Sequence, residues 1–274
     1  MILYGTDGNG GLKELFGAEW GQGSDARAWL TGDFTGGGTT EIAQLWDNQG
    51  QLGMTFYRTD GKGGLKPWFS NGYIGASSAA LRGGWLTGDF TGGGTTEIVQ
   101  LRDNDSRLAM TLYGTDDNGG LRQLSDNLNM GQGSGALAWL TGDFTGGGRT
   151  EIAQLWSDNG KLAMILYGTN GKGDLKELFG SEWGQGSDAL PGGWLTGDFT
   201  GGGTTEIVQL WDNQGQLGIT LYGTDGKGGL TQLFRNGNMG ASSAALAWLT
   251  GDFTGAAPCR LRSSSFGITK ASSR

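Results

Sequence analysis

The sequence predicts an all-β fold made from one repeated unit, and two recurring motifs support this prediction. Gly-Asp-Phe-Thr-Gly occurs five times, with its aspartate at positions 33, 89, 143, 198 and 252. Leu-Tyr-Gly-Thr or a near copy also occurs five times, starting at positions 3, 56, 112, 166 and 221. The tryptophan that opens each unit stands at 29, 85, 139, 194 and 248, so the spacings are 56, 54, 55 and 54. Such units stack because none of them can bury its own apolar face alone.

Within the first complete unit, the apolar pattern changes over short distances, as it does in strands. We expect strands at 29–34, 40–46, 51–57 and 64–69, separated by turns rich in Gly, Asn and Asp. No helical period is present along the chain. The pattern therefore predicts four antiparallel strands in each unit, which is the make-up of a propeller blade.

The phase of the repeat predicts how the fold closes. The chain begins halfway through a unit, at residues 1–4, and ends with the first half of another unit from Trp248 onward. A closed ring can join two half-units and hide both sheet edges. The sequence therefore predicts one domain, residues 1–274, that forms a five-bladed β-propeller closed by pairing the N- and C-terminal strands. Residues 1–28 would complete the last blade. The sequence departs from the repeat at Ala256, and we expect residues 263–274 to be a mobile tail.

Composition and charge exclude several classes of function. The net charge of −8 and the scattered basic residues disfavour a nucleic-acid partner. No apolar run is long enough to span a membrane, and no signal peptide is visible at the start, although we expect action outside the cell or at its surface. The single cysteine, Cys259, excludes an internal disulfide framework. There is no histidine, which removes the usual group for proton transfer near neutral pH. We therefore expect no catalysis.

The segment Gly-Asp-Phe-Thr-Gly-Gly-Gly-Thr-Thr-Glu-Ile, from Gly32 to Ile42, resembles the loop of the FG-GAP, or VCBS, repeat of integrin-type β-propellers. The resemblance implies the propeller fold, and it implies calcium binding at the aspartate and glutamate of each loop. This chain has a threonine and a glycine where the family has further oxygen ligands, and calcium takes six to eight oxygens. We expect no cofactor other than weakly bound calcium, at Asp33, Glu41, Asp89, Glu97, Asp143, Glu151, Asp198 and Glu206. The alternative is that each aspartate locks the glycine-rich turn by accepting backbone N–H groups.

A second repeated cluster predicts a sugar site. Trp46-Asp47-Asn48 recurs as Trp211-Asp212-Asn213 and, less closely, as Trp156 with Asp158 and Asn159. An indole ring can stack on the apolar face of a sugar while Asp and Asn side chains bind its hydroxyls. Unit two has Arg102 in place of the tryptophan. The alternative is structural: Trp46 fills a gap between blades and Asp47-Asn48 forms the hairpin turn.

The connections between blades offer another candidate surface. Glu19 and Trp20 in the first connection match Glu182 and Trp183 in the fourth, and these residues could line sugar pockets between blades.

These patterns predict a non-catalytic, multivalent, lectin-like protein whose partners are glycans or glycoproteins. The alternative is a structural or protein-interaction scaffold, natural or engineered, without a sugar ligand. A glycan-processing enzyme would need unlike carboxylates from different units, which the sequence does not show.

Overall fold

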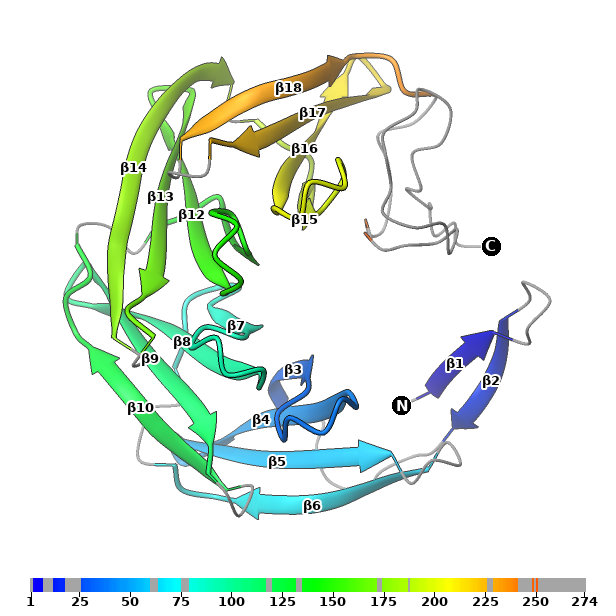
Figure 1. Cartoon of the computed structure of the whole chain (residues 1–274), viewed down its shortest axis with the longest axis vertical. Coiled ribbons are helices and arrows are strands. Elements are labelled where there is room, and N and C mark those ends of the chain that lie inside the picture. The colour runs from blue at the N-terminus through cyan, green and yellow to red at the C-terminus, as the bar shows by residue number, and fades with distance from the viewer. Residues whose placement is uncertain are drawn as a thin grey trace. The chain divides into compact units, whose positions relative to one another are not determined.

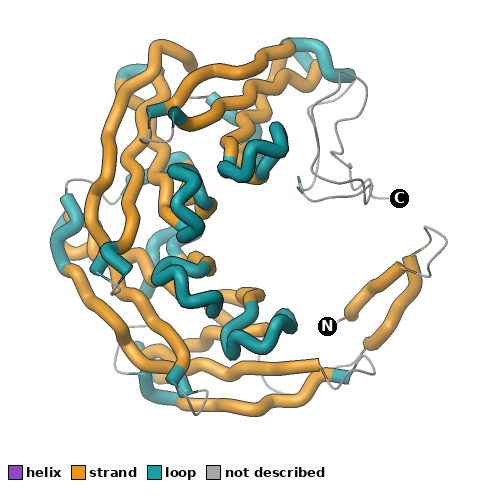
Figure 2. Tube along the Cα trace, viewed as in Figure 1, coloured by secondary structure: helices purple, strands orange, loops and turns teal. Residues whose placement is uncertain are grey.

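The computed structural model describes residues 2–6, 12–17, 26–59, 64–74, 79–116, 120–131, 135–171, 174–186, 188–225, 229–240, 248 and 250. In these ranges every regular element is a β-strand and no helix occurs, as Figure 2 shows by colour. The all-β prediction is therefore confirmed.

Sixteen of the strands form four four-stranded antiparallel sheets, and in each sheet neighbouring strands are consecutive in the chain (Figure 1). The first sheet contains β3 (Ala26–Gly32), β4 (Glu41–Asn48), β5 (Gln51–Thr59) and β6 (Leu65–Asn71). The second contains β7 (Trp85–Gly88), β8 (Glu97–Asn104), β9 (Arg107–Thr115) and β10 (Leu121–Asn127). The third contains β11 (Ala138–Gly142), β12 (Glu151–Asp158), β13 (Lys161–Thr169) and β14 (Leu175–Gly186). The fourth contains β15 (Trp194–Gly197), β16 (Glu206–Asn213), β17 (Gln216–Thr224) and β18 (Leu230–Asn236). The predicted unit of four blade-like strands is thus confirmed four times.

The fifth predicted blade is not complete among the described residues. At the N-terminus, β1 (Ile2–Thr6) pairs with β2 (Leu12–Gly17) as a two-stranded antiparallel sheet. Most of the partner segment from Trp248 onward, and the predicted tail at 263–274, lie outside the described residues. Closure of a five-bladed ring therefore stays a prediction.

The chain divides into two compact units. One contains residues 1–87, 94–102 and 111–126, and the other contains residues 88–93, 103–110 and 127–274. Strands β7 to β10 contribute residues to both units.

Several strand ends differ from the prediction, and two of these differences have a clear structural cause. The first strand of the repeat runs from Ala26 to Gly32 rather than from 29 to 34, because Phe34 donates its backbone N–H to the Glu41 side chain and not to a backbone carbonyl of β4. The strand β14 continues to Gly186, so Glu182 and Trp183 lie in a strand and not in a connection, which corrects the sequence-based expectation. Its residues 181 to 183 pair with β13, which extends the fourth strand of this sheet.

The hairpin between the second and third strands has the same turn in every sheet. Asn48 pairs with Gln51, which leaves two residues, Gln49 and Gly50, to make the turn. Both have positive φ, 53° and 86°, as a type I′ turn requires. This turn matches the twist of the flanking strands, so it fixes their register.

Apolar side chains of the second and third strands form the core of each sheet. In the first compact unit the buried cluster includes Phe34, Leu45, Met54 and Phe56. In the second compact unit one cluster includes Phe144, Leu155 and Leu166, and another includes Val208, Leu210 and Leu221. The phenylalanine of the Gly-Asp-Phe-Thr-Gly motif is thus a core residue, which explains part of the motif.

The rest of the motif is explained by contacts with the next repeat. The backbone of Asp33 exchanges two hydrogen bonds with Thr96: its N–H donates to the hydroxyl at 3.0 Å, and its carbonyl accepts the Thr96 N–H at 2.7 Å. The Phe34 carbonyl accepts the hydroxyl of Thr115, the threonine of Leu-Tyr-Gly-Thr, at 2.5 Å. Asp143 and Thr205 make the same pair of bonds in the second compact unit. The two repeated motifs therefore connect consecutive repeats through hydrogen bonds.

Candidate functional site

The aspartate of each Gly-Asp-Phe-Thr-Gly loop accepts hydrogen bonds from the glycine backbone. Asp33 accepts the N–H groups of Gly37 and Gly38 at 3.0 and 2.7 Å. Asp143 accepts those of Gly147 and Gly148 in the same way. In the other two loops, Asp89 accepts from two glycines and Asp198 from three. These hydrogen bonds hold the glycine-rich turn in place, as in the alternative that the sequence offered to a calcium site.

The glutamate that follows each loop is buried, and three of the four make the same set of bonds. Glu41 accepts the N–H groups of Phe34 and Thr35 and the hydroxyl of Thr35, the last at 2.7 Å. Glu151 and Glu206 accept the corresponding three donors in their loops. Glu97, also buried, accepts the hydroxyl of Thr95 at 3.3 Å. Burial raises the pKa of the Glu151 carboxyl above its ordinary value, against the opposing effect of the hydrogen bonds from Thr145 and Phe144.

Metal binding at these loops stays a prediction. A cation at the loop would compete with the amide donors that each carboxylate already accepts. Within the described ranges, no cluster of three or more Asp, Glu, Cys or His side chains is suitable for a metal ion.

The tryptophan of the second strand lies over a glycine of the third strand. Trp46 pairs with Gly53, and a Cβ on that glycine would lie 2.5 Å from the indole ring. Trp211 and Gly218 show the same arrangement at 2.4 Å. Each indole is half-buried and packs on a glycine of its own sheet, and the alternative that it fills a gap between blades stays a prediction.

The polar residues beside these tryptophans make structural contacts. Asp47 accepts the N–H of Gly50 at 3.1 Å and pairs with Arg27 at 3.5 Å, while Asn48 donates to the Gly72 carbonyl at 2.7 Å. In the fourth sheet, Asp212 accepts the N–H of Gly215 and Asn213 donates to the Gly237 carbonyl. These side chains hold the hairpin turn and the segment after the fourth strand.

The third sheet departs from this pattern. Ser157 takes the place of the first aspartate, and Asn159 is the first turn residue with φ of 51°. Its amide donates to Asp158 at 3.0 Å. Only Trp156 of this cluster corresponds in position to Trp46 and Trp211.

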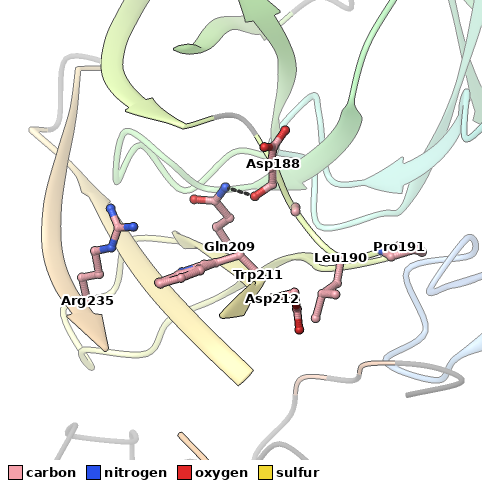
Figure 3. A pocket seen from close by; sticks show the side chains of 8 residues that line it. Asp188, Leu190, Pro191, Gln209, Trp211, Asp212 and Arg235 are labelled. Atoms are coloured by element: carbon pink, nitrogen blue, oxygen red, sulfur yellow. Dashed lines mark hydrogen bonds between the residues drawn. The ribbon is translucent and has the colours of Figure 1, made fainter. Parts of the chain in front are cut away.

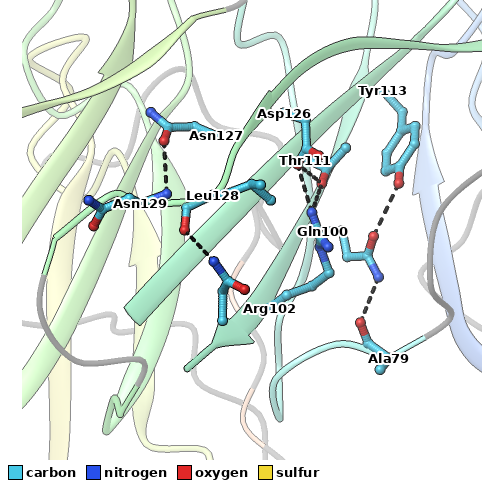
Figure 4. Close-up of polar contacts among 10 residues, drawn as sticks. Ala79, Gln100, Arg102, Thr111, Tyr113, Asp126, Asn127, Leu128 and Asn129 are labelled. Carbon is cyan, nitrogen blue, oxygen red and sulfur yellow. Dashed lines mark hydrogen bonds and ion pairs between the residues drawn. The ribbon is translucent and has the colours of Figure 1, made fainter. Parts of the chain in front are cut away.

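In the second sheet, Arg102 stands at the position of the tryptophan and forms an ion pair. The guanidinium of Arg102 contacts Asp126 at 2.7 Å and the Thr111 hydroxyl at 2.8 Å (Figure 4). Thr111 also donates to Asp126. The charge of Arg102 is therefore neutralised on its own sheet, and this position is unlike the three tryptophan positions.

In the second, third and fourth sheets, a glutamine on the second strand links the sheet to the connection that precedes it. Figure 4 shows Tyr113 donating to the Gln100 side-chain oxygen, while the Gln100 amide donates to the Ala79 carbonyl at 2.7 Å. Gln154 and Gln209 make the corresponding bonds with Tyr167 and Tyr222 and with the carbonyls of Gly135 and Asp188. Burial raises the pKa of the four tyrosines of this position above the ordinary value, and that of Tyr113 reaches about 12.

In the third and fourth sheets, residues of this connection and of the second strand line a pocket beside the tryptophan. The pocket at Trp211 has a volume of about 440 Å³ (Figure 3) and includes Asp188, Leu190, Gln209, Trp211, Asp212 and Arg235. The pocket at Trp156 has a volume of about 480 Å³ and includes Gly135, Leu137, Gln154, Trp156, Ser157 and Ile165. A second-strand tryptophan and residues of the connection that precedes its sheet thus line the same pocket.

Several pocket residues were missed by the sequence reasoning. Gln154 and Gln209 belong to the repeated Thr-Glu-Ile-x-Gln-Leu motif. Each stands two residues before the tryptophan and so on the same strand face, which could have predicted that it lies beside the tryptophan. Arg235 has no such signal, because its position beside Trp211 depends on the register of the outer strand. Glu19 and Trp20 lie outside the described residues, and the side chains of Glu182 and Trp183 do as well.

Comparisons with known proteins give weak similarities. No family model matches the sequence, and no curated protein matches it. The rhamnogalacturonan lyase YesW aligns with 76% of this chain and 48% of its own, at 14% identity and a TM-score of 0.44. The Photorhabdus luminescens Tc holotoxin pore aligns with 86% of this chain and 11% of its own, at 15% identity and a TM-score of 0.49. TolB from Acinetobacter baumannii aligns with 83% and 57%, at 14% identity and a TM-score of 0.28. The chain thus spans less than two thirds of each structure's length, and the blade-like architecture rests on its own strand order and register.

In the part of the chain that the structure describes, no helix has the length and apolar character needed to cross a membrane.

Proposed function

We propose that this protein is a non-catalytic, multivalent carbohydrate-binding protein of the lectin type. The observation that carries the proposal is the repetition of one pocket, with an indole, a glutamine and a backbone connection, in the third and fourth sheets. Two pockets of like construction favour repeated binding of like ligands.

The chemistry of the pockets suits a sugar. Trp156 and Trp211 are half-buried, and the exposed part of the Trp156 indole is available for an apolar sugar face. The Arg235 guanidinium lies over the Trp211 ring, 4.6 Å from its centroid, so a sugar at that indole would bind beside the cation. The neighbouring backbone carbonyls, Ser157 and Asp212 supply acceptors and donors for hydroxyl groups. The volumes fall in the range of small-molecule sites. Trp46, which lies on its sheet as Trp211 does, is the candidate for a third site.

Weak single sites of this kind act through avidity. Several sites on one chain can engage a glycosylated surface together, and the overall affinity can rise by about a hundredfold or more without any new contact. Near-identical repeats suit this mechanism, whereas catalysis needs one asymmetric group of residues. The repeated loop carboxylates accept backbone N–H groups, and the sequence has no histidine.

A glycan array with the wild-type protein and two variants tests the proposal. We expect wild-type binding to at least one sugar, and loss of most of it in the Trp156→Ala, Trp211→Ala double variant at an unchanged fold. Trp29→Ala is the matched control, because Trp29 is 49% exposed and lies outside both pockets. Absence of binding to any glycan by the folded wild-type protein would favour a scaffold or protein-interaction role instead.

A further inference from the structure

The two pockets differ at one position of the outer strand. In the fourth sheet, Thr220 of β17 pairs with Arg235 of β18. In the third sheet the equivalent pair is Ile165 with Gly180, so no side chain stands in the place of the guanidinium. Gln232 of β18 and Glu177 of β14 also occupy equivalent positions. The Glu177 carboxylate lies 3.4 Å from where a Cβ on Gly180 would be. The outer strand thus supplies a cation to the pocket at Trp211 and none to the pocket at Trp156.

The position of Arg235 allows it to bind an anion without leaving the indole. Its Cζ atom lies 4.6 Å from the centroid of the Trp211 ring, which is a cation–π contact. A guanidinium that stacks on an aromatic ring through its face keeps N–H groups at its edge, and these groups recognise a carboxylate. A neutral sugar would have to share the indole face with the guanidinium, but a sugar carboxylate can be bound at its edge.

Nearby charges decide whether an anion is accepted. The net charge of −8 opposes an anionic ligand, but at physiological ionic strength charges beyond about 8 Å are largely screened. Two acidic residues line the pocket. Figure 3 shows Asp212 and Arg235 on opposite sides of Trp211, with the Asp188 carboxylate turned away from the guanidinium. Asp212 also accepts the N–H of Gly215. On its side of the pocket, Arg235 is therefore the dominant charge.

From this difference, and resting on the proposed sugar-binding function, we infer that the Trp211 pocket selects sugars with a carboxylate, such as hexuronic acids, whereas the Trp156 pocket takes neutral sugars.

The experiment uses an array that presents each hexose beside its uronic acid, at low and high salt. Wild-type protein binds both kinds, and its uronate binding weakens with salt. Arg235→Gln lowers uronate affinity by about tenfold and leaves neutral-sugar affinity unchanged. Arg122→Gln, which changes an exposed arginine of β10 outside both pockets, is the matched control. The Glu177→Gln, Gly180→Arg double variant copies the β18 residues into β14 and raises uronate binding.

The possible failures are distinguishable. Uronate affinity that is equal in wild-type protein, Arg235→Gln and Arg122→Gln, with no gain in the double variant, overturns this inference and leaves sugar binding intact. Absence of binding to both neutral and acidic sugars overturns the proposed function as well.

Discussion

The side chain of Thr96 fills the space in which Gly32 would carry a Cβ, because such an atom would lie only 2.4 Å from the threonine Cγ2. The same threonine exchanges two hydrogen bonds with the backbone of Asp33. Gly32, which precedes the loop aspartate, thus makes room for a threonine of the next repeat. Gly142 receives Thr205 in the same way, also at 2.4 Å.

This contact predicts that Gly142→Ala destabilises the protein. The added methyl group forces the Thr205 side chain or the backbone to move, and overpacking of this kind costs about 1–3 kcal/mol. Gly135→Ala is the matched control, since a Cβ there meets nothing within 4 Å. The measurement is the free energy of unfolding in urea. Equal stabilities for the two variants would show that the contact does not hold the repeats together.

The Tyr113 phenol predicts a loss of stability at alkaline pH. Burial raises its pKa from 10.0 to about 12, opposed in part by the nearby Arg102 charge and a hydrogen bond from Thr111. Because the folded-state pKa is the higher one, this stabilisation is fully present below pH 10 and is lost as the pH rises through about 12. Wild-type protein therefore loses about 1 kcal/mol more between pH 9 and pH 11 than Tyr113→Phe does. Identical pH slopes in urea unfolding would contradict the buried, protonated phenol.

Asn213 tests the structural role of the polar residues beside the tryptophans. Its amide donates to the Gly237 carbonyl at 2.7 Å, so Asn213→Ala removes one partly buried hydrogen bond and costs about 1 kcal/mol. Sugar affinity is expected to stay within about twofold of the wild-type value, because a change that leaves the binding contacts intact leaves the binding free energy nearly unchanged. A large loss of affinity at unchanged stability would instead assign Asn213 to the binding site.

Chelation tests the calcium expectation. The Asp33 and Glu41 carboxylates accept backbone N–H groups of their own loop, so removal of metal is expected to leave the melting temperature unchanged. Calcium added back after chelation should likewise produce no stabilisation. A drop of many degrees on chelation, reversed by calcium, would show that these loops are occupied metal sites.

The sequence was sufficient to locate the strands, since alternating apolar residues and glycine-rich turns recur in every unit. It also placed Trp46, Trp156 and Trp211 on second strands, although each strand continues for two residues beyond its tryptophan. Local pattern could not show that an indole lies over Gly53 or Gly218, because that contact depends on the cross-strand partner.

The pocket was harder to predict than the strands. Arg235 and Trp211 are 24 positions apart, and a register shift between Leu221 and Tyr222 intervenes in the β17–β18 pairing. The connection residues reach the pocket through a hydrogen bond from Gln209 to the Asp188 carbonyl. Such contacts between segments distant in the sequence follow from tertiary packing, and no local motif contains them.

Calorimetric titration of the full chain with a neutral hexose and with its uronic acid tests the central claim of repeated tryptophan sites most directly. The account predicts that the two sugars together fill more than one site per chain, and that Trp156→Ala lowers the number of neutral sugars bound whereas Trp211→Ala lowers the number of uronates bound. A single bound sugar, unaffected by either substitution in a folded protein, would contradict it.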